Sequence, residues 1–202
     1  MSREQTLEKW LPKSPLKEKK RLVIYDFDNT LFNSPQREDG EILYLEATGK
    51  EWPFSGWWGR PETLLPPLVP DPIPESMLVA ETVAAYRKDR ECPDSFLVLM
   101  TGRPAKMRHR IREILSTFDI RFDDEFYRGM KGHPQHGDTL DIKLNIIQSH
   151  LVHDALEILE IWEDRPEHSS RFMTEARRWK AKYRNHLRKV IVHDVTGEHH
   201  EF

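Results

Sequence analysis

Residues 22–32 read Leu-Val-Ile-Tyr-Asp-Phe-Asp-Asn-Thr-Leu-Phe, an apolar run that ends in two carboxylates. Its apolar, partly β-branched beginning predicts a buried strand over about 21–27. Because side chains alternate between the faces of a strand, Asp26 and Asp28 are expected to project the same way. Two adjacent anions repel each other and lose hydration unless a cation or a proton holds them. An Asp-x-Asp pair can also simply begin a turn, so the interpretation needs support from elsewhere in the chain.

Strands and helices alternate along most of the remaining chain. Further strands are predicted at 96–100, 156–162 and 189–193, with a short one near 122–127, and helices at 75–89, from 105 to about 117, at 139–152 and after residue 166. This alternation indicates βαβ units and an α/β fold with a mainly parallel sheet. In such a sheet ligands bind at the carboxyl edge, where loops from separate strands converge.

Residues 33–75 interrupt this alternation. They hold most of the prolines, the pair Trp57 and Trp58, and few clean periodicities. We therefore expect a small insertion after the first strand, within a single domain that spans residues 1–202. The two tryptophans either stack on a base at the mouth of a site or pack the insertion onto the core.

Three of the predicted strands run into polar motifs. These are Asp26-Phe27-Asp28-Asn29-Thr30, Thr101-Gly102-Arg103 and Glu163-Asp164-Arg165. Parallel strands bring all three motifs to one edge of the sheet. A carboxylate that faces a phosphate needs cationic help, and Mg²⁺ held by a few carboxylates plus phosphate oxygens is a common solution. Glu163-Asp164-Arg165 could otherwise cap a helix.

Together with Lys143, these motifs resemble the four signature motifs of the haloacid dehalogenase-like (HAD) hydrolases, most of which are Mg²⁺-dependent phosphohydrolases. The resemblance covers roughly residues 21–170. It implies a HAD-like Rossmannoid three-layer sandwich, in which residues 33–75 form a cap or flap. Lys143 could instead be a solvated helix lysine, and Lys131 would then be its replacement.

The family pattern implies a role for each residue. Asp26 would be the nucleophile that forms an aspartyl-phosphate, and Asp28 would protonate the leaving oxygen and later activate water. Thr101 would hold a phosphoryl oxygen, and Lys143 would neutralise charge. The implied metal ligands, for Mg²⁺, are Asp26, Asp28, Asp164 and Glu163. The candidate substrate-binding residues are Thr101, Gly102, Arg103, Trp57, Trp58 and Arg165.

Three features resemble, more closely, the HAD domains of Swiss Army Knife RNA-repair proteins. They are the Asp-Phe-Asp-Asn-Thr-Leu-Phe run, the Gly56-Trp57-Trp58 segment, and His168 shortly after Glu163-Asp164-Arg165. This resemblance implies a phosphatase that acts on RNA or DNA ends. Phosphatases of small phosphate esters or phosphoproteins, and an inactive HAD fold used as a binding module, remain alternatives. The chain has no Gly-x-x-x-x-Gly-Lys-Ser/Thr element, so kinase activity is not expected.

Composition limits the remaining possibilities. The net charge of −3 excludes polyanion binding by charge alone, although basic residues cluster at 106–112 and 171–189. Such clusters suit a polyanionic substrate or are ordinary solvated helix faces. The single cysteine, Cys92, excludes an internal disulfide and favours a reducing compartment. With no apolar leader and no span of ~18 apolar residues, we expect a cytoplasmic protein without a membrane partner.

Overall fold

One six-stranded sheet forms the centre of the computed structural model, which describes residues 15–130, 138–153, 155–195 and 198–202. Its strand order is β3-β2-β1-β4-β5-β6, and all neighbouring strands are parallel except β5 and β6. The bounds are β1 (Arg21–Tyr25), β2 (Ser95–Pro104), β3 (Asp124–Arg128), β4 (Ile158–Glu163), β5 (Lys189–Asp194) and β6 (Glu198–Glu201).

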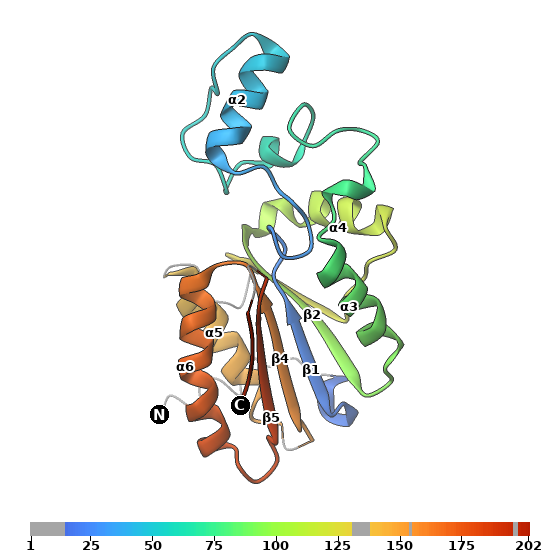
Figure 1. Ribbon diagram of the computed structural model, residues 1–202, viewed down its shortest axis with the longest axis vertical. Coiled ribbons are helices and arrows are strands. Elements are labelled where there is room, and N and C mark those ends of the chain that lie inside the picture. Colours follow the sequence, from blue (N-terminus) through green and yellow to red (C-terminus); the bar gives the residue numbers. More distant parts are fainter. Residues whose placement is uncertain (1–14, 131–137, 154, 196–197) are drawn as a thin grey trace.

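Helices cover the sheet on both faces (Figure 1). On one face lie α3 (Ala80–Glu91) and α4 (Arg108–Thr117), and on the other lie α5 (Thr139–His150) and α6 (Pro166–Lys182). A further helix, α2 (Arg37–Thr48), and the short 3₁₀ turns η1 (Pro15–Glu18), η2 (Pro61–Leu64), η3 (Glu75–Met77) and η4 (Ala105–Met107) complete the described elements. The result is the three-layer, HAD-like Rossmannoid arrangement expected from the sequence.

The alternation of side chains along β1 divides the core into two halves. Leu22 and Ile24 join the cluster beneath α5 and α6, whereas Val23 and Tyr25 join the cluster beneath α3 and α4. Because both faces of β1 are buried, its sequence is a continuous apolar run rather than an alternating one. Phe27, just after β1, is also buried in the cluster beneath α3 and α4. Its neighbours Asp26 and Asp28 are not part of that cluster and lie at the carboxyl edge of the sheet.

The observed elements differ from the predicted ones at several places. The helix predicted from residue 75 is divided into η3 and α3, because Leu78 and Val79 are extended: Leu78 pairs with Phe32, and the Val79 amide donates to the Leu31 carbonyl. Strand β2 continues past residue 100 to Pro104. The antiparallel strand β6 was not predicted, since its sequence lacks an apolar face.

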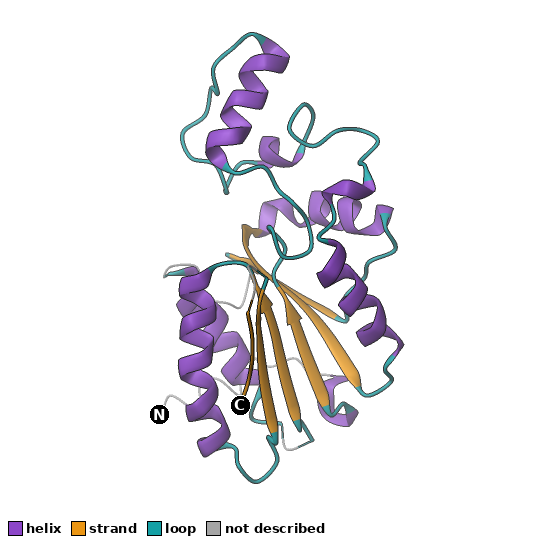
Figure 2. Ribbon diagram, in the orientation of Figure 1, coloured by secondary structure: helices purple, strands orange, loops and turns teal. Residues whose placement is uncertain are grey.

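Residues 33–75 lie beyond the carboxyl ends of the parallel strands (Figure 2). Within this segment, Trp57 is 3% exposed and its Nε1 donates to the Pro35 carbonyl at 2.9 Å. A Cβ on Gly40 would overlap the Trp57 indole, so the glycine permits α2 to pack on this ring. Trp57 therefore packs the insertion. Trp58 remains 39% exposed.

Candidate active site

A tight loop after β1 positions the two predicted catalytic carboxylates. The amides of Leu31 and Phe32 both donate to the Phe27 carbonyl, and Asn29 adopts a left-handed conformation with φ 51°. Asparagine tolerates this conformation better than most residues. The Phe27 ring stacks on Phe32 with 5.5 Å between centroids. The loop thus anchors the peptide between Asp26 and Asp28 in the core.

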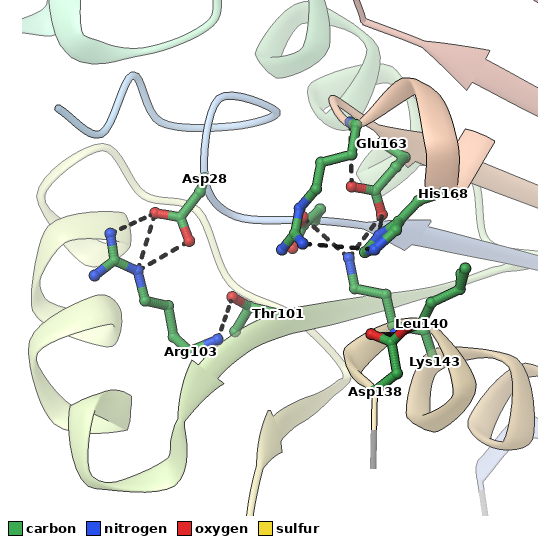
Figure 3. Close-up of polar contacts among 10 residues, drawn as sticks. Asp28, Thr101, Arg103, Asp138, Leu140, Lys143, Glu163 and His168 are labelled. Carbon is green, nitrogen blue, oxygen red and sulfur yellow. Dashed lines mark hydrogen bonds and ion pairs between the residues drawn. The ribbon is translucent and has the colours of Figure 1, made fainter. Parts of the chain in front are cut away.

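Lys143 reaches from α5 to the end of β1 and forms the centre of a buried charged group. Its Nζ lies 3.0 Å from Asp26 Oδ2 and 2.7 Å from Glu163 Oε2. The same Glu163 oxygen lies 3.3 Å from His168 Nδ1 (Figure 3). All four side chains are at most 4% exposed, so Lys143 is not a solvated helix lysine. Lys131, its predicted replacement, lies outside the described residues.

In this group, burial and the neighbouring charges act on the pKa of each residue in opposite directions. Burial raises the pKa of Asp26 well above its usual range, while Lys143 opposes that rise. Burial alone would lower the pKa of Lys143, but Asp26 and Glu163 outweigh it and the pKa is raised. Burial alone would raise the pKa of Glu163, but Lys143 and His168 outweigh it and the pKa is lowered. Lys143 and Glu163 therefore form a persistent ion pair beside Asp26.

Three carboxylates offer oxygens that could share a metal ion. One oxygen each from Asp26, Glu163 and Asp164 lie within 4.8 Å of one another. Burial, followed by the charge of Glu163, raises the pKa of Asp164 to about 7. Oδ1 of Asp26 and Oδ1 of Asp164 are buried without a hydrogen-bond partner in the described part of the chain. Buried carboxylate oxygens are costly unless they are paired, and oxygen ligands of this kind suit a hard divalent cation.

The four predicted metal ligands do not all belong to this group. Glu163 has its oxygens engaged by Lys143 and by the Arg165 amide, which leaves Asp26 and Asp164 with open oxygens. Asp28 is not part of the carboxylate cluster found among the described residues. The physical reason is a stronger local partner, because the carboxylate of Asp28 is held by the guanidinium of Arg103.

Arg103, predicted to bind substrate, is buried, and each of its three guanidinium nitrogens forms a hydrogen bond. Its Nε lies 2.9 Å from Asp28 Oδ2 and its Nη2 2.8 Å from Asp28 Oδ1, a two-pronged pair (Figure 3). Its Nη1 donates to Thr63 Oγ1 at 2.6 Å and to the Trp58 carbonyl at 3.3 Å. The Trp58 ring lies 4.8 Å from the guanidinium carbon. The Arg103 amide also donates to Thr101 Oγ1 at 3.1 Å.

A small cavity lies beside Lys143. Thr101 and Lys143 line it, together with Thr139 from the start of α5 and Arg128 from the end of β3. A Cβ on Gly102 would meet the Thr139 methyl at 2.9 Å, so glycine allows β2 and α5 to approach closely here. Residues of β2, β3 and α5 thus line this cavity.

Two arginines at this edge have no ion pair with a carboxylate among the described residues. Arg165 lies close to Gly102, and its Nη1 is 3.5 Å from His168 Nε2. Arg128 approaches Gly59 of the insertion. Sequence reasoning missed Arg128, although its place at the carboxyl end of a predicted strand was the signal that could have found it.

Several residues of the two predicted basic clusters are engaged by other parts of the chain. Arg108 and Arg112 pair with Glu125, and Arg110 donates to the Leu64 carbonyl. The second cluster begins in α6, which runs away from the carboxyl edge for 17 residues, or about 25 Å. Arg188, at its far end, pairs with Glu157. Local ion pairs therefore compensate part of the first cluster, and the direction of α6 takes the second cluster away from the carboxyl edge.

The fold and this grouping of side chains are those of a HAD-type domain. The chain belongs to HAD domain family 1 in Swiss Army Knife RNA repair proteins, whose family model matches residues 45–201. The matched region includes Thr101, Lys143, Glu163 and Asp164, and it begins after Asp26 and Asp28. None of the described helices combines the length and the apolar character that a membrane span requires.

Two solved structures are similar to the chain, with a TM-score of 0.47 in each case. They are the "Structure of Pnkp1/Rnl/Hen1 complex", at 14% identity over 88% of this chain, and the "Structure of the Pnkp1/Rnl/Hen1 RNA repair complex", at 12% over 91%. The chain spans 45% and 44% of the chains that it matches. A comparison with curated proteins found no match.

Proposed function

We propose that the chain is a Mg²⁺-dependent phosphatase that hydrolyses phosphate monoesters at RNA or DNA ends through a phosphorylated Asp26. One observation carries this proposal: buried Lys143 holds one oxygen of Asp26, the other oxygen has no hydrogen-bond partner among the described residues, and Asp164 offers a carboxylate oxygen within 4.8 Å of Asp26. A carboxylate held in this way is oriented and charge-compensated for attack on phosphorus. Membership of a family of RNA-repair HAD domains supports the same conclusion.

The proposed reaction has two steps that share the same residues. In the first, a carboxylate oxygen of Asp26 bonds to phosphorus, the bond to the ester oxygen breaks, and Asp28 gives that oxygen a proton. In the second, water attacks the phosphorus, Asp28 takes back a proton, and Asp26 is released with inorganic phosphate. Covalent capture divides one difficult hydrolysis into two easier steps.

Thr101 and Lys143 would act on the phosphoryl group itself. Thr101 lines the same cavity as Lys143, so its hydroxyl is suited to hold a phosphoryl oxygen next to the ammonium. Asp26 and Asp164, supported by Glu163, would hold the metal through their open oxygens. The bound ion would neutralise charge that develops on the phosphoryl oxygens.

Three features support a nucleic-acid end as the substrate. The exposed ring of Trp58 lies beside Arg103 and offers a surface on which a base can stack. Arg165 and Arg128 are cations at the same edge without a described carboxylate partner, and they suit backbone phosphates. We propose that residues 33–75 form the cap that carries this platform.

The test is a direct comparison of substrates with purified protein. 3′- and 5′-phosphorylated RNA and DNA oligomers, mononucleotides, phosphopeptides and p-nitrophenyl phosphate are offered with Mg²⁺ or with EDTA. We expect Mg²⁺-dependent release of phosphate, fastest from oligomers, which Asp26→Asn abolishes. Asp119→Asn, which alters a 90%-exposed carboxylate, is the matched control. Binding of oligomers without turnover of any ester would instead identify an inactive binding module, and equally slow turnover of all esters would contradict the nucleic-acid substrate.

A further inference from the structure

Arg103 joins Asp28 to the segment that we propose as a cap. It lies in β2, yet all its side-chain partners belong to other segments: Asp28 in the loop after β1, and Thr63 and Trp58 in residues 33–75. Its side chain is 1% exposed, against 16% for Asp28. A guanidinium without solvent around it is held where its partners place it.

The geometry of the pair restricts Asp28 more than a single hydrogen bond would. Arg103 Nε contacts both carboxylate oxygens, at 3.1 and 2.9 Å, and Nη2 contacts Oδ1 at 2.8 Å. A planar two-pronged contact defines both the position and the rotation of the carboxylate. Lysine cannot reproduce it, because an ammonium is a point charge.

The opposite side of the same guanidinium is bound by the insertion. Thr63 Oγ1 accepts from Nη1 while its own hydroxyl donates to the Arg60 carbonyl at 2.7 Å. Thr63 is fully buried, so this contact is not exchanged for water. A change in the position of residues 58–63 would therefore move Arg103, and with it the carboxylate of Asp28.

We propose that Arg103 is a positioning residue: it orients Asp28 for proton transfer and makes that orientation depend on the seating of residues 58–63. This inference rests on the proposed function for its kinetic consequence, and it replaces the predicted substrate-binding role of Arg103. Arg165 then contacts the phosphate, because its guanidinium forms no ion pair with a carboxylate among the described residues.

A double-mutant cycle on kcat tests the kinetic part. Arg103→Lys should lower kcat about 100-fold, the size of effect that a small misplacement of a catalytic group produces, with KM nearly unchanged. Combined with Asp28→Asn, it should lower kcat no further than Asp28→Asn alone, because both changes act through one carboxylate. Arg90→Lys, which alters an arginine paired with Asp123 away from the site, is the matched control.

Additive losses, or a raised KM with kcat unchanged, would overturn the inference and return Arg103 to phosphate binding. Melting curves of each variant separate these effects from misfolding. If wild-type protein turns over no ester, the proposed function fails. Amide hydrogen exchange then still tests whether Arg103 couples Asp28 to residues 58–63. Residues 58–64 should exchange faster in both Asp28→Asn and Arg103→Lys but not in Arg90→Lys. Unchanged exchange there would disprove the link.

Discussion

Lys143 Nζ lies 3.0 Å from Asp26 Oδ2, so the predicted catalytic lysine is paired with the predicted nucleophile. The contact crosses from α5 to the end of β1, and both side chains are 3% exposed. Because Lys143 also holds Glu163, one ammonium serves two buried carboxylates. Three of the predictions below concern charges in or beside this buried arrangement.

Replacement of Lys143 by Met should destabilise the fold and abolish turnover. Removal of the cation leaves Asp26 and Glu163 buried without compensation, and breaking a buried pair in this way costs about 3–5 kcal/mol. Urea unfolding in EDTA measures the loss. Lys88→Met, at an exposed position of α3, should change stability by less than about 0.5 kcal/mol. Equal stability of the two variants would contradict the buried ion pair.

Stabilisation by Mg²⁺ should depend on pH through Asp164. Its pKa in the metal-free fold is raised from 3.8 to about 7, so its proton-linked stability is complete below pH 3.8 and is lost as the pH rises through 7. Mg²⁺ must displace that proton, and its binding therefore strengthens over the same range. Melting temperatures with and without Mg²⁺ should differ more at pH 8 than at pH 6.

The matched variant for the metal site is Asp164→Asn, which removes the titrating group. It should abolish both the Mg²⁺-induced rise in melting temperature and its pH dependence, while EDTA-treated protein remains folded. A rise in melting temperature that is independent of pH would argue against Asp164 as a ligand.

A second charged network predicts the acid sensitivity of the fold. Glu160 binds Arg21 at 2.5 Å and His193 at 2.8 Å. Burial alone would raise the pKa of Glu160, but His193 and Arg21 outweigh it and the pKa is lowered from 4.5. The ionised Glu160 therefore stabilises the fold above pH 4.5, and this stabilisation is lost as the pH falls through the lowered pKa of Glu160 in the folded protein. Glu160→Gln should flatten the acid limb of unfolding free energy against pH, whereas exposed Glu46→Gln should leave it unchanged.

Alanine substitutions of the adjacent tryptophans should have different effects, one on stability and the other on substrate binding. Trp57→Ala removes a buried ring and should cost about 3–5 kcal/mol in urea unfolding. Trp58→Ala removes an exposed ring and should instead raise KM for oligomers by about tenfold, consistent with stacking worth about 1–3 kcal/mol per base. If KM for p-nitrophenyl phosphate rose as much as KM for oligomers, Trp58 would not be a base platform.

Arg128 should contribute one phosphate contact to oligomer binding. Arg128→Ala is expected to weaken binding and to reduce the slope of log affinity against log salt by about 1. Arg121→Ala, whose exposed side chain pairs with Asp119, is the comparison variant. Fluorescence anisotropy with a labelled oligomer at several salt concentrations measures both slopes, and identical slopes would exclude Arg128 from the site.

Local sequence was sufficient for the parallel sheet and for the motifs at its edge. Each central strand is a continuous apolar run because both of its faces are covered, and this pattern is readable without coordinates. The helix α2 was not predicted, since Gly40 is its one buried residue and no apolar stripe marks a helical face. Apolar side chains of α2, such as Ile42 and Leu45, are exposed instead.

What the sequence by itself determined is the chemistry available at the carboxyl edge, because strand direction and polar strand ends place Asp26, Thr101 and Asp164 there. Only the tertiary structure decided how the charges are paired. Arg103 and Arg165 each end a polar motif at the carboxyl edge, yet one is buried against Asp28 and Thr63 while the other is not paired with a carboxylate among the described residues. Such pairing depends on distances between segments that are far apart in the chain, and no local pattern encodes those distances.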